Sequence, residues 1–413
     1  MKHIYLIDVT NRDGVQTARL GLAKLEKTLV NMMLNELGVW QSEFGFPFTK
    51  HEINYLNANL ELAQMGVITP MRLSGWMRAV PEDVEISWKL VPKLEYANLS
   101  ASTSEQMIKT KYQGKRGEQE VINDMVKAVE LAYSKGAKGI GVNAEDASRT
   151  DIDFLVEFAI AAKDAGAERI RYCDTLGYDD PFTIYERIRS LAEQVKLPIE
   201  MHCHNDLGMA VACSVTGARG CIDGGQDAYV NTTVNGIGER AGNADLVSTI
   251  LAIKHSSGLG DGKYKLDERV HLKHAWKIAK YASYAFDVPI PINQPGVGAN
   301  AFAHASGIHA DGALKDRRNY ELYDYEELGR GEPEIIDTGR HIVVGEYSGI
   351  KGFKNVYGKL EVAFHSEEEA KKVLELARYA NVHKQKPLTA DELKFIAHYP
   401  EQAKKIMTMT PLV

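Results

Sequence analysis

The segment 199–206 (IEMHCHND) has the pattern of a β-strand that ends in two histidines. Side chains of a strand alternate between its two faces, so His202 and His204 point to one face and Cys203 points to the other. Two imidazoles held side by side at a strand end suit a divalent metal ion whose remaining ligands come from other segments. A hydrogen-bonded surface pair is the commoner role of an isolated His-x-His, so this segment alone leaves both roles open.

Other segments add polar side chains of the kinds that active sites use. They are residues 8–16 (DVTNRDGVQ), 143–149 (NAEDASR), 235–243 (NGIGERAGN) and 304–309 (HASGIH). The first three follow short apolar runs of the length of a strand. The fold therefore decides whether these segments meet the two histidines.

Short apolar runs alternate with helical patterns along the first 255 residues. The predicted strands cover residues 4–8, 39–44, 71–75, 96–101, 139–143, 169–173, 199–203 and 227–232. Helical patterns cover 18–37, 117–135 and 151–165, and residues 49–52 (TKHE) have the pattern of a capping box. Eight β–α repeats predict an α/β fold, a (β/α)8 TIM barrel. An open doubly wound sheet is the alternative, but it would lack the glycine-rich turn that binds dinucleotides.

A barrel would bring the polar residues together, because the C-terminal ends of its strands meet at one mouth. At or just past these ends lie Asp8, Glu43, Asn143, Glu145, Asp174, Thr175, His202 and His204. Barrel enzymes place their chemistry at this mouth. Exposure to solvent would explain one polar residue at a strand end, whereas eight polar residues at one rim indicate an active site.

The pattern changes after residue 255. A Gly/Ser-rich loop precedes a helical pattern over 266–286, and the proline-rich segment 289–296 is typical of a linker. We expect a catalytic barrel over residues 1–258, a helical linker over 259–296 and a smaller, mostly helical C-terminal subdomain over 297–413.

Composition excludes several classes of protein. Of the 413 residues, 44% are hydrophobic and 25% charged, which is ordinary for a globular protein, and the net charge of −7 without a long basic run argues against nucleic-acid binding. No apolar run is long enough to span a membrane, and the first residues already form a predicted strand rather than a signal peptide. We expect a cytoplasmic protein whose four cysteines are free thiols.

The combined motifs resemble the acyl-CoA-condensing branch of the metal-dependent barrel lyases, which includes isopropylmalate synthase and homocitrate synthase. The family's Arg-Asp-Gly-x-Gln motif is matched by residues 12–16, its His-x-His-Asn-Asp motif by 202–206, and its Asn-Gly-x-Gly-Glu-Arg-x-Gly-Asn loop by 235–243. The resemblance covers about residues 3 to 360. It implies that Asp13, His202 and His204 bind the metal ion, with Asn243 near or on it.

Such a ligand set suits Mn²⁺ or Mg²⁺, with Co²⁺ as a further candidate, and leaves positions open for a 2-oxo acid. A bound metal would act as a Lewis acid on the ketone, and Arg12 could stabilise the alkoxide that forms. An ion pair with Glu43 is the alternative role for Arg12. Acetyl-CoA, the implied co-substrate, must lose a methyl proton to a base.

The resemblance implies His309 as this base, Glu145 as the acidic partner that orients it, and Tyr320 as an assisting residue at the thioester. In the family the C-terminal unit reaches over the barrel of a neighbouring subunit, so a homodimer with exchanged subdomains is implied. The basic residues Lys315, Arg317 and Arg318 are predicted to lie near the CoA phosphates, with a solvated surface run as the alternative.

Further family positions imply contacts with the 2-oxo acid at Gln16, Arg78, Arg149 and Thr175. A solvated surface charge is the alternative for Arg78. Departures from the family occur at Asn11, where leucine is usual, at Gln106, which is often histidine, and at Asn231, which is often glutamate. Amide donors at 11 and 106 would suit a second carboxylate on the substrate rather than an isopropyl group.

The predicted activity is a Claisen-type condensation of acetyl-CoA with a 2-oxo acid, followed by hydrolysis of the thioester. Within the family the sequence most resembles the Re-type citrate synthases, which use oxaloacetate. A homocitrate synthase acting on 2-oxoglutarate is the alternative, followed by an enzyme like isopropylmalate synthase. A retro-aldol acyl-CoA lyase is a more distant alternative, because those enzymes lack the appended unit. A metal-stabilised scaffold protein is a non-enzyme alternative, but it would leave the gathering of eight polar residues at one rim without an explanation.

Overall fold

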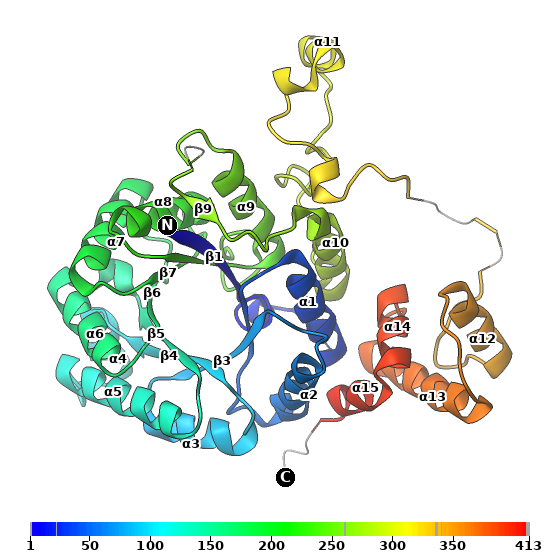
Figure 1. Ribbon diagram of the computed structural model, residues 1–413, viewed down its shortest axis with the longest axis horizontal. Helices are drawn as coiled ribbons and strands as arrows, with labels where there is room; N and C mark the ends of the chain where they lie inside the picture. The colour runs from blue at the N-terminus through cyan, green and yellow to red at the C-terminus, as the bar shows by residue number, and fades with distance from the viewer. Residues whose placement is uncertain (1, 22, 260–261, 335–337, 340, 410–413) are drawn as a thin grey trace.

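A closed ring of eight parallel strands forms the centre of the computed structural model, which describes residues 2–21, 23–259, 262–334, 338–339 and 341–409 (Figure 1). The strands are β1 (His3–Asp8), β2 (Gln41–Gly45), β3 (Arg72–Arg78), β4 (Tyr96–Ser102), β5 (Gly139–Glu145), β6 (Arg169–Asp174), β7 (Ile199–Cys203) and β8 (Ala228–Thr232). β1 pairs with both β8 and β2, which closes the ring. The predicted (β/α)8 barrel is confirmed, with strand ends shifted by at most three residues.

Helices surround the ring and continue beyond it as a mostly helical C-terminal part (Figure 1). The barrel helices are α1 (Lys24–Leu37), α2 (Ile53–Gln64), α3 (Pro81–Leu90), α4 (Glu105–Lys111), α5 (Glu118–Ser134), α6 (Ile152–Asp164), α7 (Pro181–Val195), α8 (Ala210–Asp223) and α9 (Leu246–His255). They are followed by α10 (Ala275–Phe286), α11 (Gly307–Lys315), α12 (Ile350–Lys359), α13 (Glu367–Lys384), α14 (Ala390–His398) and α15 (Pro400–Met407). None of the described helices is long and apolar enough to cross a membrane.

Three helix predictions need correction. For the pattern over 18–37, the helix begins at Lys24. For the pattern over 266–286, the helix begins at Ala275, and residues 265–266 at its start form a short strand, β9 (Lys265–Leu266), beside β1. The capping box is also wrong, since Thr49 makes no side-chain cap. Its expected partner Glu52 instead accepts hydrogen bonds from the ammonium groups of Lys24 and Lys27 and from the backbone N–H of Phe46.

Strand alternation divides the barrel into an apolar outer layer and a polar interior. On β7, Ile199 and Met201 belong to the hydrophobic core beneath the helices. Glu200 and His202, at the alternate positions, face the interior. Arg169 and Arg171 on β6 follow the same alternation and are among the largest fully buried side chains. The barrel axis is therefore filled with charged groups rather than aliphatic ones.

The C-terminal part returns to the barrel after leaving it. α11 lies outside the ring of helices, whereas α14 and α15 pack against α1, and α15 also packs against α2 (Figure 1). A buried cluster secures this return: the Lys384 ammonium lies 2.5 Å from Glu392 and 3.3 Å from Glu26 of α1. Tyr281 of α10 donates to the same Glu392 at 2.8 Å.

A buried amide network ties the start of the barrel together. Asn31 of α1 donates to the hydroxyl of Tyr55 and to Asn59 of α2, and its carbonyl oxygen accepts from Ser42 of β2 and from Asn11, which follows β1. All four hydrogen bonds are 2.9 to 3.1 Å long. Asn31 thus joins two helices, one strand and the loop that carries Arg12 and Asp13.

We expect Asn31→Ala to lower the free energy of unfolding by about 3 kcal/mol or more, because each buried polar group left without a partner costs about 1–3 kcal/mol. Asn57→Ala on α2 is the matched control, since Asn57 is partly exposed and water can replace its bonds. Denaturant unfolding of both variants measures the difference. Equal destabilisation of the two variants would contradict a network of this strength.

Candidate active site

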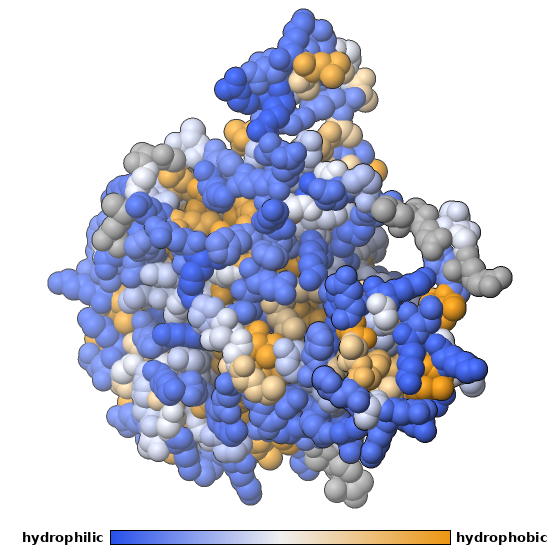
Figure 2. Space-filling model, turned by 45° about the vertical axis from the view of Figure 1, so that its right-hand side comes forward, coloured by the Kyte–Doolittle hydropathy of each residue, from blue (hydrophilic) through white to orange (hydrophobic). Residues whose placement is uncertain are grey.

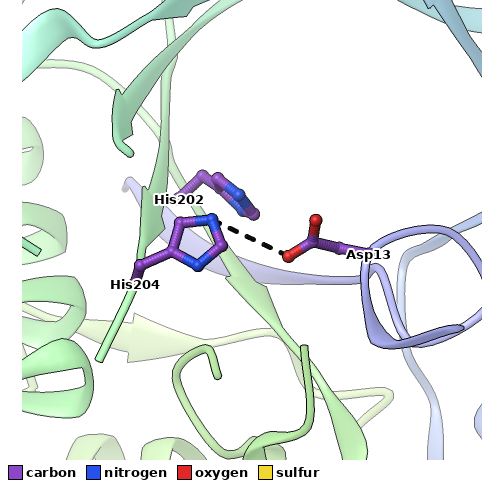
Figure 3. A group of neighbouring side chains, drawn as sticks. All are labelled: Asp13, His202 and His204. Atoms are coloured by element: carbon purple, nitrogen blue, oxygen red, sulfur yellow. Dashed lines mark ion pairs between the residues drawn. The ribbon is translucent and has the colours of Figure 1, made fainter. Parts of the chain in front are cut away.

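Asp13, His202 and His204 meet at the C-terminal mouth of the barrel (Figure 3). Asp13 lies in a tight turn after β1, where the carbonyl of Val9 accepts from the backbone N–H groups of residues 12, 13 and 14. His202 lies on β7 and His204 just after it. One ligand atom from each of the three residues lies within 4.8 Å of the others, and all three residues are buried. The predicted metal ligands are thus brought together.

Hydrogen bonds fix the orientation of both imidazoles. Nδ1 of His204 faces the carbonyl oxygen of Gly242 at 3.2 Å, and Nδ1 of His202 faces Oδ1 of Asn231 at 3.1 Å. Asn231 must present its oxygen to His202, because its amide nitrogen donates to the Glu200 carboxylate, which only accepts. Both histidines therefore carry the proton on Nδ1 and offer the Nε2 lone pair to a metal ion.

Electrostatics favour the protonation states that a metal ion requires. Burial, reinforced by the neighbouring His204, holds the pKa of His202 well below its ordinary value, and burial also lowers the pKa of His204. Burial would raise the pKa of Asp13, but the charge of Arg12 and the hydrogen bond from Asn243 hold that pKa well below its usual range. Two neutral imidazoles and one carboxylate are thus ready at neutral pH.

Asn243 supplies a fourth oxygen beside these ligands. Its Nδ2 donates to Asp13 at 2.7 Å, while its buried Oδ1 accepts no hydrogen bond from the described part of the chain. A buried amide oxygen without a donor is costly unless a cation or water satisfies it. The two nitrogen and two oxygen donors fit a hexacoordinate Mn²⁺ or Mg²⁺ ion that keeps positions open.

Arg12 makes the ion pair with Glu43 that was its alternative role, and it also contacts a metal ligand. Its Nε lies 2.8 Å from Glu43, and its Nη1 lies 2.8 Å from Asp13. Nη2 makes no hydrogen bond to any described residue and stays available to an oxyanion at the mouth. Although burial opposes it, the charges of Arg171 and Arg12 lower the pKa of Glu43 to about 2.

Sequence reasoning missed the charged residues below this rim. Arg171 bridges Glu43 and Glu200, and Arg169 binds Glu200 at 2.6 Å. Asn98 links the same groups, because it donates to Glu43 and accepts from Arg169. The signal was present, since Glu200 precedes His202 by two positions and therefore shares its face of the strand.

The prediction that Asn11 offers an amide donor to the substrate is wrong in this structure. Asn11 is fully buried, and its Nδ2 donates to the backbone oxygen of Lys27 and to Asn31. Both amide hydrogens are therefore spent on α1, behind the barrel mouth. The turn around Val9 directs Arg12 and Asp13 to the mouth and Asn11 to the helix.

Other predicted substrate contacts lie around the rim with protein partners. Arg149 forms an ion pair with Asp146 at 2.7 Å, and the hydroxyl of Thr175 accepts from the backbone N–H of Asp146. Arg78 is an exposed charge that Asp83 engages through two guanidinium nitrogens. Gln16 and Gln106 are exposed, and neither side chain has a described hydrogen bond.

The expected base lies far from the metal ligands of its own chain. His309 is exposed on α11, where its ring stacks on Tyr320 with centroids 4.2 Å apart. α11 stands clear of the main body in two views (Figures 1 and 2). The structure therefore brings His309 and Tyr320 together but does not bring them to Glu145, whose carboxylate instead binds Lys111 and Ser102.

The predicted basic cluster on this arm is neutralised. Lys315 pairs with Asp311, Arg317 with Asp324 and Arg318 with Asp316, at 2.5 to 2.7 Å. These cations have local carboxylate partners, which weakens the expectation that they bind CoA phosphates.

Comparisons with known proteins match this architecture. The HMGL-like family model matches residues 3–281, and the homocitrate synthase post-HMGL domain-like model matches residues 297–385. The chain is 64% identical to citrate (Re)-synthase of Dehalococcoides mccartyi, with full coverage of both chains. It is 39% identical to 2-isopropylmalate synthase 2 of Caldanaerobacter subterraneus subsp. tengcongensis, covering 96% of this chain and 95% of that one.

Among solved structures, the barrel is similar to hydroxymethylglutaryl-CoA lyase from Pseudomonas aeruginosa, with a TM-score of 0.57 and 15% sequence identity. The match covers 70% of this chain and 95% of that chain. At this identity the similarity shows a shared fold.

We expect Asn231→Ala to weaken Mn²⁺ binding about 10- to 100-fold, because it removes the partner that orients His202. His202→Ala should abolish measurable Mn²⁺ binding and turnover while the barrel stays folded. Calorimetric titration of metal-free protein measures both effects, and Cys203→Ala is the control, since this side chain points away from the site. Unchanged Mn²⁺ affinity in His202→Ala would exclude this ligand set.

Proposed function

The chain belongs to the HMGL-like family, and from this membership we propose that it is a citrate synthase of the Re type. It joins acetyl-CoA to oxaloacetate and hydrolyses the thioester, so that acetyl-CoA, oxaloacetate and water yield citrate and free CoA. It is therefore an acyltransferase that converts an acyl group into an alkyl group on transfer. The observation that carries the proposal is the 64% identity to a citrate (Re)-synthase over the full length of both chains.

The metal-binding part of the proposal assigns Asp13, His202 and His204 as ligands, with Asn243 as an additional oxygen donor. When bound, a Mn²⁺ or Mg²⁺ ion supplies Lewis-acid activation of the ketone. Arg12 directs its Nη2 to the oxygen that becomes an alkoxide, where a fixed positive charge stabilises the transition state. Glu43 holds this guanidinium in place through its Nε.

The base in this proposal is His309 of the C-terminal subdomain (297–413), assisted by Tyr320. A neutral imidazole at His309 takes a proton from the acetyl methyl group, and the resulting carbon nucleophile attacks the ketone. Glu145 orients this imidazole. Stacking on Tyr320 supports a shared role for the two side chains, because it places the phenol beside the ring.

We place this base in the active site of a second copy of the chain. Exposed apolar residues on the arm support such a contact: Ile308, Leu314 and Leu322 are 75%, 89% and 73% exposed. Solvent-exposed apolar side chains beside a functional histidine favour burial against a partner. The proposed assembly is a homodimer in which each subdomain completes the other barrel, in a cytoplasmic setting that suits four free cysteines.

A homocitrate synthase is the alternative with a specific observation in its favour, because the model that matches residues 297–385 carries that name. The two substrates differ by one methylene, which a pocket discriminates by about 1–3 kcal/mol. A lyase is disfavoured because residues 297–385 match the homocitrate synthase post-HMGL domain-like model, a unit that the retro-aldol lyases are expected to lack.

We expect kcat/KM for oxaloacetate to exceed the values for 2-oxoglutarate, 2-oxoisovalerate and pyruvate by tenfold or more. Release of free CoA from acetyl-CoA in the presence of Mn²⁺ measures all four acids, and a chelator should stop the release with each of them. A tenfold preference for another acid would overturn the assignment of oxaloacetate while leaving the metal ligands unaffected.

We expect activity to return when two inactive variants are mixed. Asp13→Ala lacks a metal ligand and His309→Ala lacks the base, a loss that typically costs about 10²–10⁴ in rate. A heterodimer of the two holds one intact site if the base comes from the partner. Mixing Asp13→Ala with His202→Ala is the control, because both changes disable the barrel. Failure to recover activity in exchanged heterodimers would indicate that each chain uses its own base.

A further inference from the structure

A cavity of about 760 Å³ opens between the ends of β3, β4 and β5 and the segment that joins α4 to α5. Its wall includes Trp76, Arg78, Ser100, Ser102, Lys111 and Glu145. Four of these are the last residues of their elements: Arg78 of β3, Ser102 of β4, Glu145 of β5 and Lys111 of α4. Strand-end position places the cavity at the catalytic mouth.

Trp76 connects this cavity with the metal ligands. The Arg12 guanidinium lies over the Trp76 ring, 5.8 Å from its centroid, and the same guanidinium bonds to Asp13. A 2-oxo acid whose ketone and first carboxylate lie at Asp13 and the histidines can therefore extend its side chain past Trp76. The far end of a dicarboxylic substrate would then lie in the cavity.

Lys111 is the cation that reaches furthest toward the strand ends in this cavity. Its Nζ lies 2.6 and 2.7 Å from the two oxygens of Glu145 and 3.2 Å from the hydroxyl of Ser102. An ammonium group has three donors, so a substrate carboxylate would take the place of the 3.2 Å contact with Ser102 while the two contacts with Glu145 remain. Its side chain is 47% exposed, so a ligand can reach it.

The other cations of the cavity are less suited to this task. Arg78 is held by Asp83 through two guanidinium nitrogens, and Arg116 pairs with Asp124 at 2.7 Å. Lys115 lies in the exposed loop after α4, beyond the strand ends. The amides expected for this role do not serve it either, since Asn11 points into α1 and Gln106 does not line the cavity.

We propose that this cavity receives the second carboxylate of the 2-oxo acid and that Lys111 selects for it. The inference rests on the proposed condensation with oxaloacetate and names the residue that distinguishes a dicarboxylic from a monocarboxylic substrate. Without Lys111, the substrate carboxylate loses its cation and also faces the unneutralised charge of Glu145. A monocarboxylic acid such as pyruvate has no group there, so its loss is limited to the effect of releasing Glu145.

The test compares kcat/KM for oxaloacetate and pyruvate in the wild type and in four variants. Lys111→Met should lower the value for oxaloacetate about 10- to 100-fold, the effect of losing a hydrogen bond to a charged group, with little change for pyruvate. Lys111→Arg should restore most of the preference. Lys115→Met, which alters a cation in the same cavity, and Ser102→Ala, which alters the other partner of Glu145, should keep the wild-type ratio.

Three outcomes would overturn the inference. An equal loss for both acids in Lys111→Met would mean that Lys111 only positions Glu145. A change confined to the KM for acetyl-CoA would assign the cavity to that substrate, and an unchanged ratio would remove Lys111 from recognition. Unaltered Mn²⁺ binding by Lys111→Met shows that the variant is folded. If the wild type prefers pyruvate, the proposed function itself is wrong. If the wild type prefers oxaloacetate but Lys111→Met keeps that preference, only the role of Lys111 is wrong.

Discussion

Charges buried inside a barrel must be paired, and this requirement organises the whole catalytic face. Arg12, Arg169 and Arg171 are balanced by Asp13, Glu43 and Glu200, and all six are largely withdrawn from solvent. An unpaired charge in such a place would cost several kcal/mol, so each partner holds the next in position. The chain of contacts runs from Arg169 near the start of β6 to Asp13 at the mouth.

The same network sets the chemistry of the candidate metal centre. Glu200 orients Asn231, Asn231 fixes the proton on His202, and Arg12 keeps Asp13 ionised. Asn231 presents a neutral amide to His202, so Asp13 is the one charged residue among the candidate ligands. The ligands therefore carry one negative charge, which leaves a divalent ion with a net positive charge toward an anionic substrate.

The sequence predicted the parts of the site that depend on strand position. His202 and His204 follow from the alternation of β7 and from the convergence of strand ends in a barrel, whereas Asp13 was implied by the match of residues 12–16 to a family motif. Asn11 was misplaced because a single turn reverses the direction of neighbouring side chains, and no periodic pattern governs a turn. Lys111 was not identified because it ends a short helix, and only the folded chain shows that this end meets β4 and β5.

The arm that carries His309 is anchored on both sides. Before it, α10 packs on α1, and after it, α14 and α15 return to α1 and α2, where Lys384 is buried between Glu26 and Glu392. A segment closed at both ends samples fewer positions than a free tail and loses less conformational entropy when it docks. The docking of this arm onto a second copy, as proposed, would therefore resemble the meeting of preformed surfaces rather than the capture of a flexible tail.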